Sequence, residues 1–302
     1  MRAAVYAKTG PPDVLQITDV EKPVPTDNEI LINVHAATVT SGDCRLRGFK
    51  FPAVFWLFMR VLHGARRPDP PIPGSELTGV IEAVGKDVRR FRAGDQVFGS
   101  TGMRFGANAE VVCMPEDGVV AHRPANMSYE EAAAVPFGAL TALYFLRKGN
   151  IQSGQRVLIN GASGGVGTYA VQIAAHFGAD VTGVCGSTNL DLVRSLGANE
   201  VIDYTWEDFT QRGELHDLIF DAVGKRSASD CRKALAPGGT FVTSAQGLVQ
   251  DRAEDLIFLK ELIEAGEMKA VIDRSYPLEQ IVEAHRYVES GHKKGNVVIT
   301  MQ

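Results

Sequence analysis

Residues 156–167 read Arg-Val-Leu-Ile-Asn-Gly-Ala-Ser-Gly-Gly-Val-Gly, and this stretch decides the fold. Arg156–Asn160 has the composition of a short buried strand, and the glycine-rich turn Gly161–Gly167 follows it directly. After the turn, apolar residues recur at helical spacing as far as Phe177. The turn matches the dinucleotide fingerprint G-x-G-x-x-G with Ala162 in the first glycine place. Strand, turn and helix together predict a βαβ unit that binds a dinucleotide.

Each position of this turn has a physical task. Gly164 lets the backbone approach a pyrophosphate closely, and Gly167 lets the helix pack tightly on the strand. The helix N-terminus offers free N–H groups and a partial positive charge to the phosphates. The alternative is a tight turn that merely needs positive φ. The candidate cofactor contacts are Gly161, Ala162, Ser163, Gly164, Gly165, Val166 and Gly167.

Strand and helix patterns alternate from Gln155 onward, which predicts a parallel sheet with helices on both faces. The expected strands are Arg156–Asn160, Asp180–Cys185, Val201–Asp203, Leu218–Asp221 and Thr240–Ser244. The expected helices are 165–177, 189–196, 254–265 and 278–290, and a last strand is expected at 296–301.

The first third of the chain has a different pattern. Short segments rich in Val, Ile and Phe are separated by Gly, Pro, Asp and Asn, as in a compact all-β unit. Ser128 then caps an expected helix, and a second helix is expected at 139–148. The expected strands of the all-β unit are Arg2–Tyr6, Glu29–Ala37, Gly79–Val84, Gln96–Phe98 and Ala109–Cys113.

The composition excludes several classes of protein. The chain is 45% apolar and 22% charged, as in ordinary globular proteins, and its net charge of −5 offers no basic surface to nucleic acid. Its four cysteines are scattered without a zinc-ligand spacing, which indicates a reducing compartment and leads us to expect a cytoplasmic protein. The most apolar stretch, Phe51–Leu62, is too short for a transmembrane helix of roughly 20 residues, so we expect no integral membrane segment.

The residues at the end of the second strand of the βαβ unit are expected to determine whether NAD or NADP is bound. An acidic residue there would hold the ribose 2′-hydroxyl of NAD. Residues 184–189 read Val-Cys-Gly-Ser-Thr-Asn and contain no acid. The hydroxyls of Ser187 and Thr188 suit a 2′-phosphate, so we expect NADP(H), although the turn contains no Lys or Arg either.

Further motifs follow in order along nearly the whole chain. They include Pro73–Gly85, Phe91–Gly99, Asp221–Gly224 and Gly295–Ile299. With the glycine turn, they resemble the zinc-independent quinone oxidoreductases, the zeta-crystallin-like branch of the medium-chain dehydrogenase/reductase superfamily. The resemblance implies an α/β protein with a GroES-like β domain and a Rossmann domain. The GroES-like catalytic domain would comprise residues 1–125 completed by 274–302, and the Rossmann NADP-binding domain residues 126–273, with the active cleft at their junction.

The resemblance also predicts that no metal is bound. Zinc alcohol dehydrogenases, the other main branch, place Cys and His ligands at three positions that fall here at Thr40, Ser75 and Phe137. A hydroxyl and a phenyl ring cannot replace thiolate and imidazole as zinc ligands. The four-cysteine structural zinc lobe is also missing from the sequence, since 100–107 is a short loop without cysteine.

The expected substrate follows from the missing metal. Alcohol oxidation is disfavoured because nothing strongly polarises an alkoxide. Reduction of an electron-poor acceptor remains feasible because the hydride chemistry belongs to the cofactor. A small apolar quinone or an enal or enone is such an acceptor, and the resemblance implies the same class. Two alternatives stay open, namely a zinc-free alcohol dehydrogenase and a nicotinamide-binding scaffold or sensor without turnover.

The resemblance supplies the remaining candidate residues. A family segment Val-Asn-Pro-x-Asp at the nicotinamide end of the cleft is here Val39-Thr40-Ser41-Gly42-Asp43, which makes Thr40 the catalytic candidate and a strand-end turn the alternative. No general acid is assigned, and solvent can supply the proton. The other candidates are cofactor contacts: Thr141 by the nicotinamide ribose, Tyr204 by the 2′-phosphate, and Asp221, Val223 and Ser244 at strand ends.

Two segments carry further expectations. The aromatic stretch Phe49–Arg67 predicts an apolar lid, a peripheral membrane contact or a core helix. After Ser244, only nine residues precede Glu254, whereas the family has a crossover and a sixth strand that often pairs in a homodimer. A parallel crossover alone takes about a dozen residues. Either the protein has lost this strand or a segment of roughly 25 residues is missing from the sequence, and the close match elsewhere favours the second.

Overall fold

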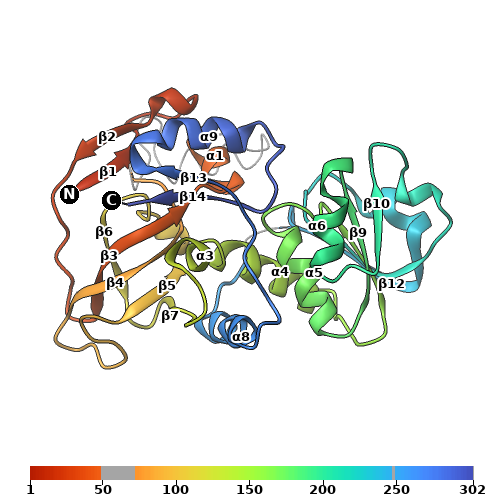
Figure 1. The fold of residues 1–302 in the computed structure, drawn as a ribbon, viewed down its shortest axis with the longest axis horizontal. Coiled ribbons are helices and arrows are strands. Elements are labelled where there is room, and N and C mark those ends of the chain that lie inside the picture. Colours follow the sequence, from red (N-terminus) through yellow and green to blue (C-terminus); the bar gives the residue numbers. More distant parts are fainter. Residues whose placement is uncertain (49–71, 247–248, 302) are drawn as a thin grey trace. The chain divides into compact units, whose positions relative to one another are not determined.

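The computed structural model describes residues 1–48, 72–246 and 249–301 and divides them into two compact units. Unit 1 consists of Met1–Pro136, Arg252–Lys260 and Ile272–Gln302, and unit 2 consists of Phe137–Asp251 and Glu261–Val271. Figure 1 shows both units and labels most of their helices and strands. Helix α8 (Ala253–Glu264) contributes residues to both units. The segment 49–71, for which we expected a lid, lies outside the described residues.

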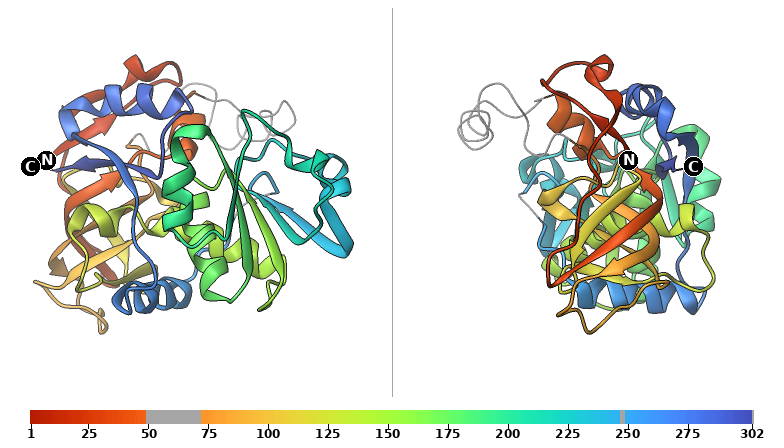
Figure 2. Two further views of the ribbon diagram at one scale, coloured as in Figure 1. Left: turned by 45° about the vertical axis from the view of Figure 1, so that its right-hand side comes forward. Right: turned by 90° about the vertical axis from the view of Figure 1, so that its left-hand side faces the viewer.

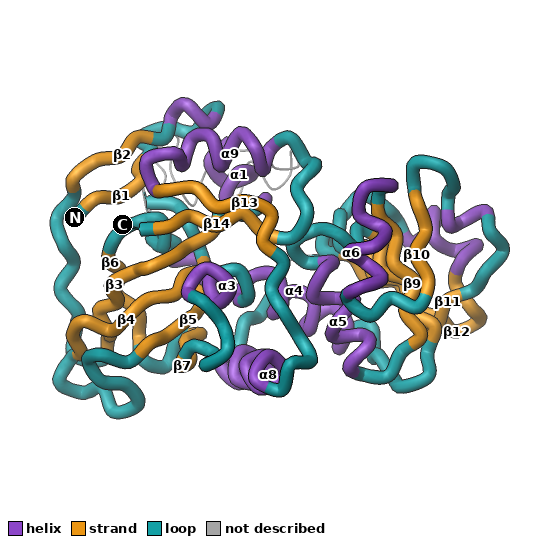
Figure 3. The backbone as a smooth tube through the Cα atoms, in the orientation of Figure 1, coloured by secondary structure: helices purple, strands orange, loops and turns teal. Residues whose placement is uncertain are grey.

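Unit 2 is built on a five-stranded parallel sheet in the order β10-β9-β8-β11-β12. Helices lie on both faces of this sheet (Figure 3), as the alternating pattern predicts. The strands are β8 (Arg156–Asn160), β9 (Asp180–Cys185), β10 (Glu200–Asp203), β11 (His216–Asp221) and β12 (Leu235–Thr243). The helices are α4 (Pro136–Lys148), α5 (Gly167–His176), α6 (Leu190–Ser195) and α7 (Ala228–Cys231), and the 3₁₀ turns are η3 (Ser187–Asn189), η4 (Phe209–Gln211) and η5 (Arg232–Ala234).

Strand β12 forms one edge of the sheet. It is followed by a short connection to α8, and the described residues contain no sixth strand of this sheet. Residues 247–248 of this connection lie outside the described residues. Whether the family's edge strand is lost or a segment is missing from the sequence therefore stays a prediction.

Unit 1 contains a seven-stranded sheet in the order β13-β14-β3-β4-β5-β7, with β6 paired to β3, and a separate β1-β2 pair. Figure 2 shows these strands curving around a common interior. The strands are β1 (Arg2–Val5), β2 (Gln16–Asp19), β3 (Glu29–Thr38), β4 (Glu76–Val84), β5 (Gln96–Ser100), β6 (Val111–Pro115), β7 (Val119–His122), β13 (Ile272–Pro277) and β14 (Asn296–Thr300). The helices are α1 (Ser41–Gly48), α3 (Tyr129–Ala133) and α9 (Ile281–Glu289), and the 3₁₀ turns are η1 (Pro12–Val14), η2 (Gly102–Arg104) and η6 (Leu278–Gln280).

The sequence accounts for several of these elements. Strand β3 buries Ile30, Ile32 and Val34 in the core of the sheet. Burial alternates only between Ile32 and Ala36, because Leu31 and Ala36–Thr38 are buried as well. The predicted cap at Ser128 is a full capping box, because Ser128 accepts from the backbone N–H of Glu131 and Glu131 accepts from the backbone N–H of Ser128. Strands β2, β7 and β13 were not expected. Strands β2 and β7 have only four residues each, and β13 contains no fully buried residue, so none of the three carries an extended apolar pattern.

A fully buried arginine holds α1, α9 and the N-terminal loop of unit 1 together. The Arg47 guanidinium donates to the carbonyl of Gly10, to Glu289 Oε1 at 2.5 Å and to His285 Nδ1 at 3.4 Å. Burial, with a smaller contribution from Arg47, lowers the pKa of His285 to about 3, so this imidazole is neutral and can accept. A buried cation with three acceptors is costly to disturb.

We expect Arg47→Met to lower the free energy of unfolding by about 3 kcal/mol, because it deprives the Glu289 carboxylate of its buried cation. Arg286→Met is the matched control. Arg286 pairs with Asp13 and Glu283 at the surface, where such pairs contribute at most about 1 kcal/mol. Urea denaturation of both variants measures the difference, and equal losses would contradict this role of Arg47.

Candidate functional site

The glycine turn of unit 2 closes back onto the neighbouring strand β9. The backbone N–H groups of Gly161 and Ala162 both donate to the carbonyl of Val184, at 3.0 and 2.9 Å. Ala162 is fully buried, and its methyl group faces Gly183 of β9, where an added Cβ would lie 3.1 Å away. A glycine on β9 therefore makes room for the alanine that stands in the first glycine place of the turn.

Gly164 and Gly167 face different surroundings. A Cβ on Gly167 would lie 2.0 Å from the carbonyl oxygen of Gly161, so α5 can pack this closely on the turn only with glycine here. A Cβ on Gly164 would have one neighbour within 4 Å, the Gly161 oxygen at 3.4 Å. Among the described residues, no other atom lies within 4 Å of this Cβ position, which leaves room for an approaching phosphate, and α5 begins three residues later.

Helix α4 packs against the same turn. A Cβ on Gly138 would lie 2.4 Å from the carbonyl oxygen of Gly165, so this helix approaches the turn through a glycine. Thr141 follows one turn later on α4 and is 6% exposed. Its predicted contact with the nicotinamide ribose stays a prediction, but its helix does reach the turn.

The carboxyl ends of β8, β11 and β12 meet at the fully buried Asp221. Its carboxylate accepts from Asn160 Nδ2 at 2.9 Å, from the backbone N–H of Arg226 at 2.7 Å and of Val223 at 3.2 Å, and from Thr243 Oγ1 at 3.4 Å. These contacts show Asp221 tying strand ends together, and a direct contact with a cofactor stays a prediction. Asn160 was missed in the sequence, although a polar residue ending an apolar strand was a usable signal.

Val223 and Ser244 surround the carboxyl end of β11. The Val223 side chain lies over Gly161, where an added Cβ would be 2.4 Å from Val223 Cγ2. The Ser244 hydroxyl donates to the carbonyl of Ala222 at 3.1 Å. The structure thus brings Gly161, Val223 and Ser244 together at the carboxyl end of the sheet, where open α/β sheets bind ligands.

The predicted 2′-phosphate residues lie at the ends of β9 and β10. Ser187 and Thr188 belong to η3, directly after β9, and Asn189 Nδ2 in this turn lies 3.4 Å from Ser163 Oγ of the glycine turn. Tyr204 is 62% exposed, and its ring lies beside Gly186, 3.5 Å from an added Cβ. The turn after β9 is thus linked to the glycine turn on one side and to Tyr204 on the other.

The catalytic candidate Thr40 lies in unit 1, where it caps α1. Its hydroxyl donates to Asp43 Oδ2 at 2.6 Å and accepts from the backbone N–H of Asp43 at 3.1 Å. Burial raises the pKa of the fully buried Asp43 carboxyl, and its hydrogen bonds with Thr40 and Gly74 oppose that shift. This is the turn role that was the alternative for Thr40. Its catalytic role stays a prediction, and it would require the hydroxyl proton to leave Asp43.

Thr40, Ser75 and Phe137 stand where zinc alcohol dehydrogenases have their metal ligands. Thr40 is buried and engaged with Asp43, and the neighbouring Glu76 accepts from the Thr38 hydroxyl. Phe137, at the third position, is 36% exposed. Within residues 1–48, 72–246 and 249–301, no three His, Cys, Asp or Glu side chains are grouped so that they could hold a metal. In that part of the chain no helix has the length and apolarity needed to cross a membrane.

Comparisons with known proteins identify the relatives of this chain. Residues 26–124 match the alcohol dehydrogenase GroES-like domain, and residues 165–270 and 244–299 match two families described as zinc-binding dehydrogenase. A 2-methylene-furan-3-one reductase from Solanum lycopersicum is 33% identical over 319 residues, covering 99% of this chain and 79% of the relative. An NADPH-dependent alkenal/one oxidoreductase, chloroplastic, from Arabidopsis thaliana is 31% identical, with coverage of 99% and 79%.

A solved structure, that of a quinone oxidoreductase from Coxiella burnetii, superimposes with a TM-score of 0.88 at 28% identity, covering 100% of this chain and 99% of the other. The fold predicted from the sequence, a GroES-like domain with a Rossmann domain, is thereby confirmed. The tomato alignment spans 319 positions against a chain of 302 residues, so that relative has residues without a counterpart here.

The two glycines predict opposite phenotypes. Gly164→Ala should leave the melting temperature nearly unchanged, because its Cβ meets nothing closer than 3.4 Å, yet it should weaken dinucleotide binding at least tenfold by occupying the phosphate's approach. Gly167→Ala should destabilise the protein itself, because its Cβ would lie 2.0 Å from the Gly161 oxygen. Thermal melts and cofactor titrations measure both. Undiminished binding by Gly164→Ala would contradict the proposed phosphate position.

Proposed function

The chain belongs to the quinone oxidoreductase branch of the medium-chain dehydrogenase/reductase superfamily, and on this premise we propose that it is an NADPH-dependent reductase of quinones and α,β-unsaturated carbonyls. The observation that carries the proposal is the open backbone at Gly164, between the end of β8 and the start of α5. The relatives that this chain matches over nearly its whole length are named for enone, alkenal and quinone reduction.

The two parts of the chain take different roles in this proposal. Residues 126–273 would bind NADPH, and residues 1–125 with 274–302 would form the catalytic domain. When bound, NADPH supplies a hydride to an electron-poor carbon of the acceptor. The N–H groups at the start of α5 would hold the pyrophosphate, and the open backbone at Gly164 would admit it. Solvent supplies the proton that completes the reduction, since the Thr40 hydroxyl already donates to Asp43.

Several finer expectations belong to the same proposal. We propose a small apolar acceptor, a cytoplasmic location and a homodimer, although the relative from Arabidopsis is named as chloroplastic. We also propose that catalysis needs no metal. The matching families are described as zinc-binding, but Thr40, Ser75 and Phe137 stand where zinc ligands would be needed.

Purified protein should oxidise NADPH when an enal, an enone or a simple quinone is added, with absorbance followed at 340 nm. Gly164→Ala, which is expected to retain the fold, is the control and should lose this activity. NADPH binding without oxidation across the whole acceptor panel would favour the scaffold alternative. Reduction of NADP⁺ by short alcohols, with no enone reduction, would favour a zinc-free alcohol dehydrogenase.

The metal prediction is tested separately. Elemental analysis of the purified protein should find far less than one zinc per chain, and EDTA or phenanthroline should leave the reductase rate unchanged. A hydroxyl pair and a phenyl ring at the ligand positions give zinc no site. Stoichiometric zinc together with loss of activity on chelation would contradict the assignment.

A further inference from the structure

The ribose end of the cofactor site contains a carboxylate that the sequence pattern does not reveal. The rule for dinucleotide sites places an acid at the end of the second strand, here β9, where this chain has Cys185. The neighbouring strand β10 ends at Asp203, which lies beside Cys185 in the register of the sheet. The fold thus brings an acid to this point from a different strand.

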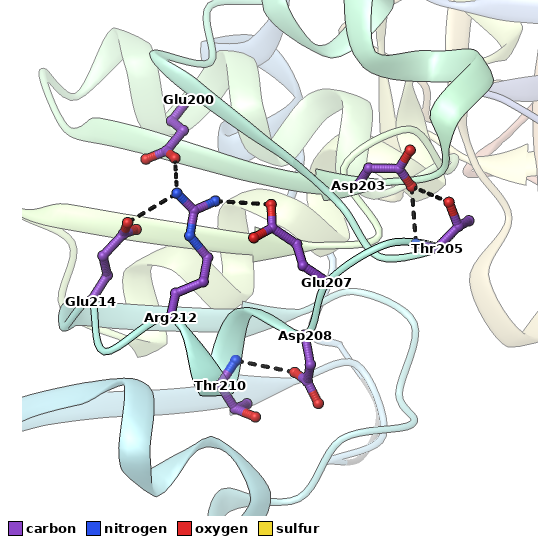
Figure 4. Close-up of polar contacts among 8 residues, drawn as sticks. All are labelled: Glu200, Asp203, Thr205, Glu207, Asp208, Thr210, Arg212 and Glu214. Atoms are coloured by element: carbon purple, nitrogen blue, oxygen red, sulfur yellow. Dashed lines mark hydrogen bonds and ion pairs between the residues drawn. The ribbon is translucent and has the colours of Figure 1, made fainter.

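Asp203 is hydrogen-bonded to Thr205, whose hydroxyl lies beside Ser187, one of the residues predicted to contact a 2′-phosphate. Its Oδ1 accepts from the backbone N–H of Thr205 at 2.9 Å and from Thr205 Oγ1 at 2.7 Å, as Figure 4 shows. Thr205 Oγ1 lies 3.0 Å from Ser187 Oγ. A hydrogen bond from Ser187, with others from Thr205, holds the pKa of Asp203 below its usual value, so the group is charged at neutral pH.

The segment that contains Asp203 is mainly acidic, and one cation, Arg194 of α6, lies within electrostatic reach of Cys185 and pairs with Asp191. Residues 200–214 contain five carboxylates and one guanidinium, Arg212. Arg212 donates to Glu200, Glu207 and Glu214 at 2.5, 3.3 and 3.0 Å (Figure 4). In the described part of the chain, the hydrogen bonds of Ser187, Asn189 and Thr205 go to hydroxyl, carboxylate or backbone partners, and none comes from a Lys or Arg side chain.

We propose that Asp203 determines cofactor specificity by limiting the preference for NADPH over NADH; this rests on the proposed function. A 2′-phosphate brings about two negative charges to a point where a carboxylate is fixed. To bind the phosphate, the Thr205 hydroxyl would have to turn from Asp203, and the Ser187 hydroxyl would have to turn from Thr205. A 2′-hydroxyl has no such conflict, because it can donate to a carboxylate, as NAD sites use it.

The test compares the dissociation constants of NADPH and NADH in wild type, Asp203→Asn and Asp203→Glu by titration of reduced-nicotinamide fluorescence. Asp203→Asn retains one oxygen, Oδ1, to accept from Thr205, and it removes the negative charge. It should raise the ratio of NADPH to NADH affinity by roughly three- to tenfold, the size of one screened charge contact. Asp203→Glu keeps the charge and should stay near the wild-type ratio.

Asp217→Asn is the matched control for charge. Asp217 accepts from the backbone N–H of Arg156 at the amino ends of β8 and β11, opposite the cofactor edge, so its loss should leave the ratio unchanged. Raising the salt concentration should increase the ratio in wild type more than in Asp203→Asn, because salt screens the repulsion. If Asp203→Asn is unstable, Asp203→Ser replaces it. The salt dependence of the affinity ratio is then compared between wild type and Asp203→Ser.

The outcomes separate this inference from the proposed function. If wild type binds both cofactors and the ratio does not rise in Asp203→Asn, the role of Asp203 is wrong while the dinucleotide site stands. If the ratio rises equally in Asp217→Asn, general charge rather than Asp203 sets it, and the inference is likewise overturned. If wild type binds neither cofactor, the proposed function and this inference both fail.

Discussion

The close approach of Gly167 to the carbonyl of Gly161 is the constraint on which the cofactor unit depends. With 2.0 Å between that oxygen and the place of a Cβ, only glycine lets α5 begin where it does. That start sets the positive end of α5 beside the free space above Gly164. Strand β9 and helix α4 contact the same turn. The carbonyl of Val184 on β9 accepts two of its backbone N–H groups. Gly183 on β9 and Gly138 on α4 allow the close approach because they have no side chain.

Much of this arrangement could be predicted from the sequence because it rests on local patterns. The glycine turn is a continuous motif, and β8 and β9 are found where apolar runs predict them. Strand β12 begins earlier than expected, at Leu235 rather than Thr240, because its Pro237-Gly238-Gly239 segment reads as a turn although Leu235 pairs with His216. Segments without a repeating apolar pattern, such as β13, are specified by their neighbours and could not be predicted from their own residues.

The site was less predictable than the fold because its contacts join residues distant in sequence. The carboxylate of Asp221, a predicted cofactor contact, accepts hydrogen bonds from Asn160, Val223, Arg226 and Thr243. The hydroxyl of Thr40 caps the next helix, the role that the sequence offered as the alternative to a catalytic one. The rule for NAD sites places an acid at the end of β9, whereas in this fold Asp203 at the end of β10 lies beside that point. In each case the position of the side chain depends on how strands pair or how a helix is capped. A single sequence motif does not contain that information.

The central claim is that a dinucleotide binds on the backbone of residues 161–168. Hydrogen–deuterium exchange of the wild-type protein with and without NADPH tests it directly, since exchange reports each segment separately. The claim predicts slower exchange across 161–168 and the turn 186–189 when NADPH is present, with the amino-end segment around Asp217 unchanged. Saturating NADPH that leaves exchange in 161–168 unaltered would contradict it.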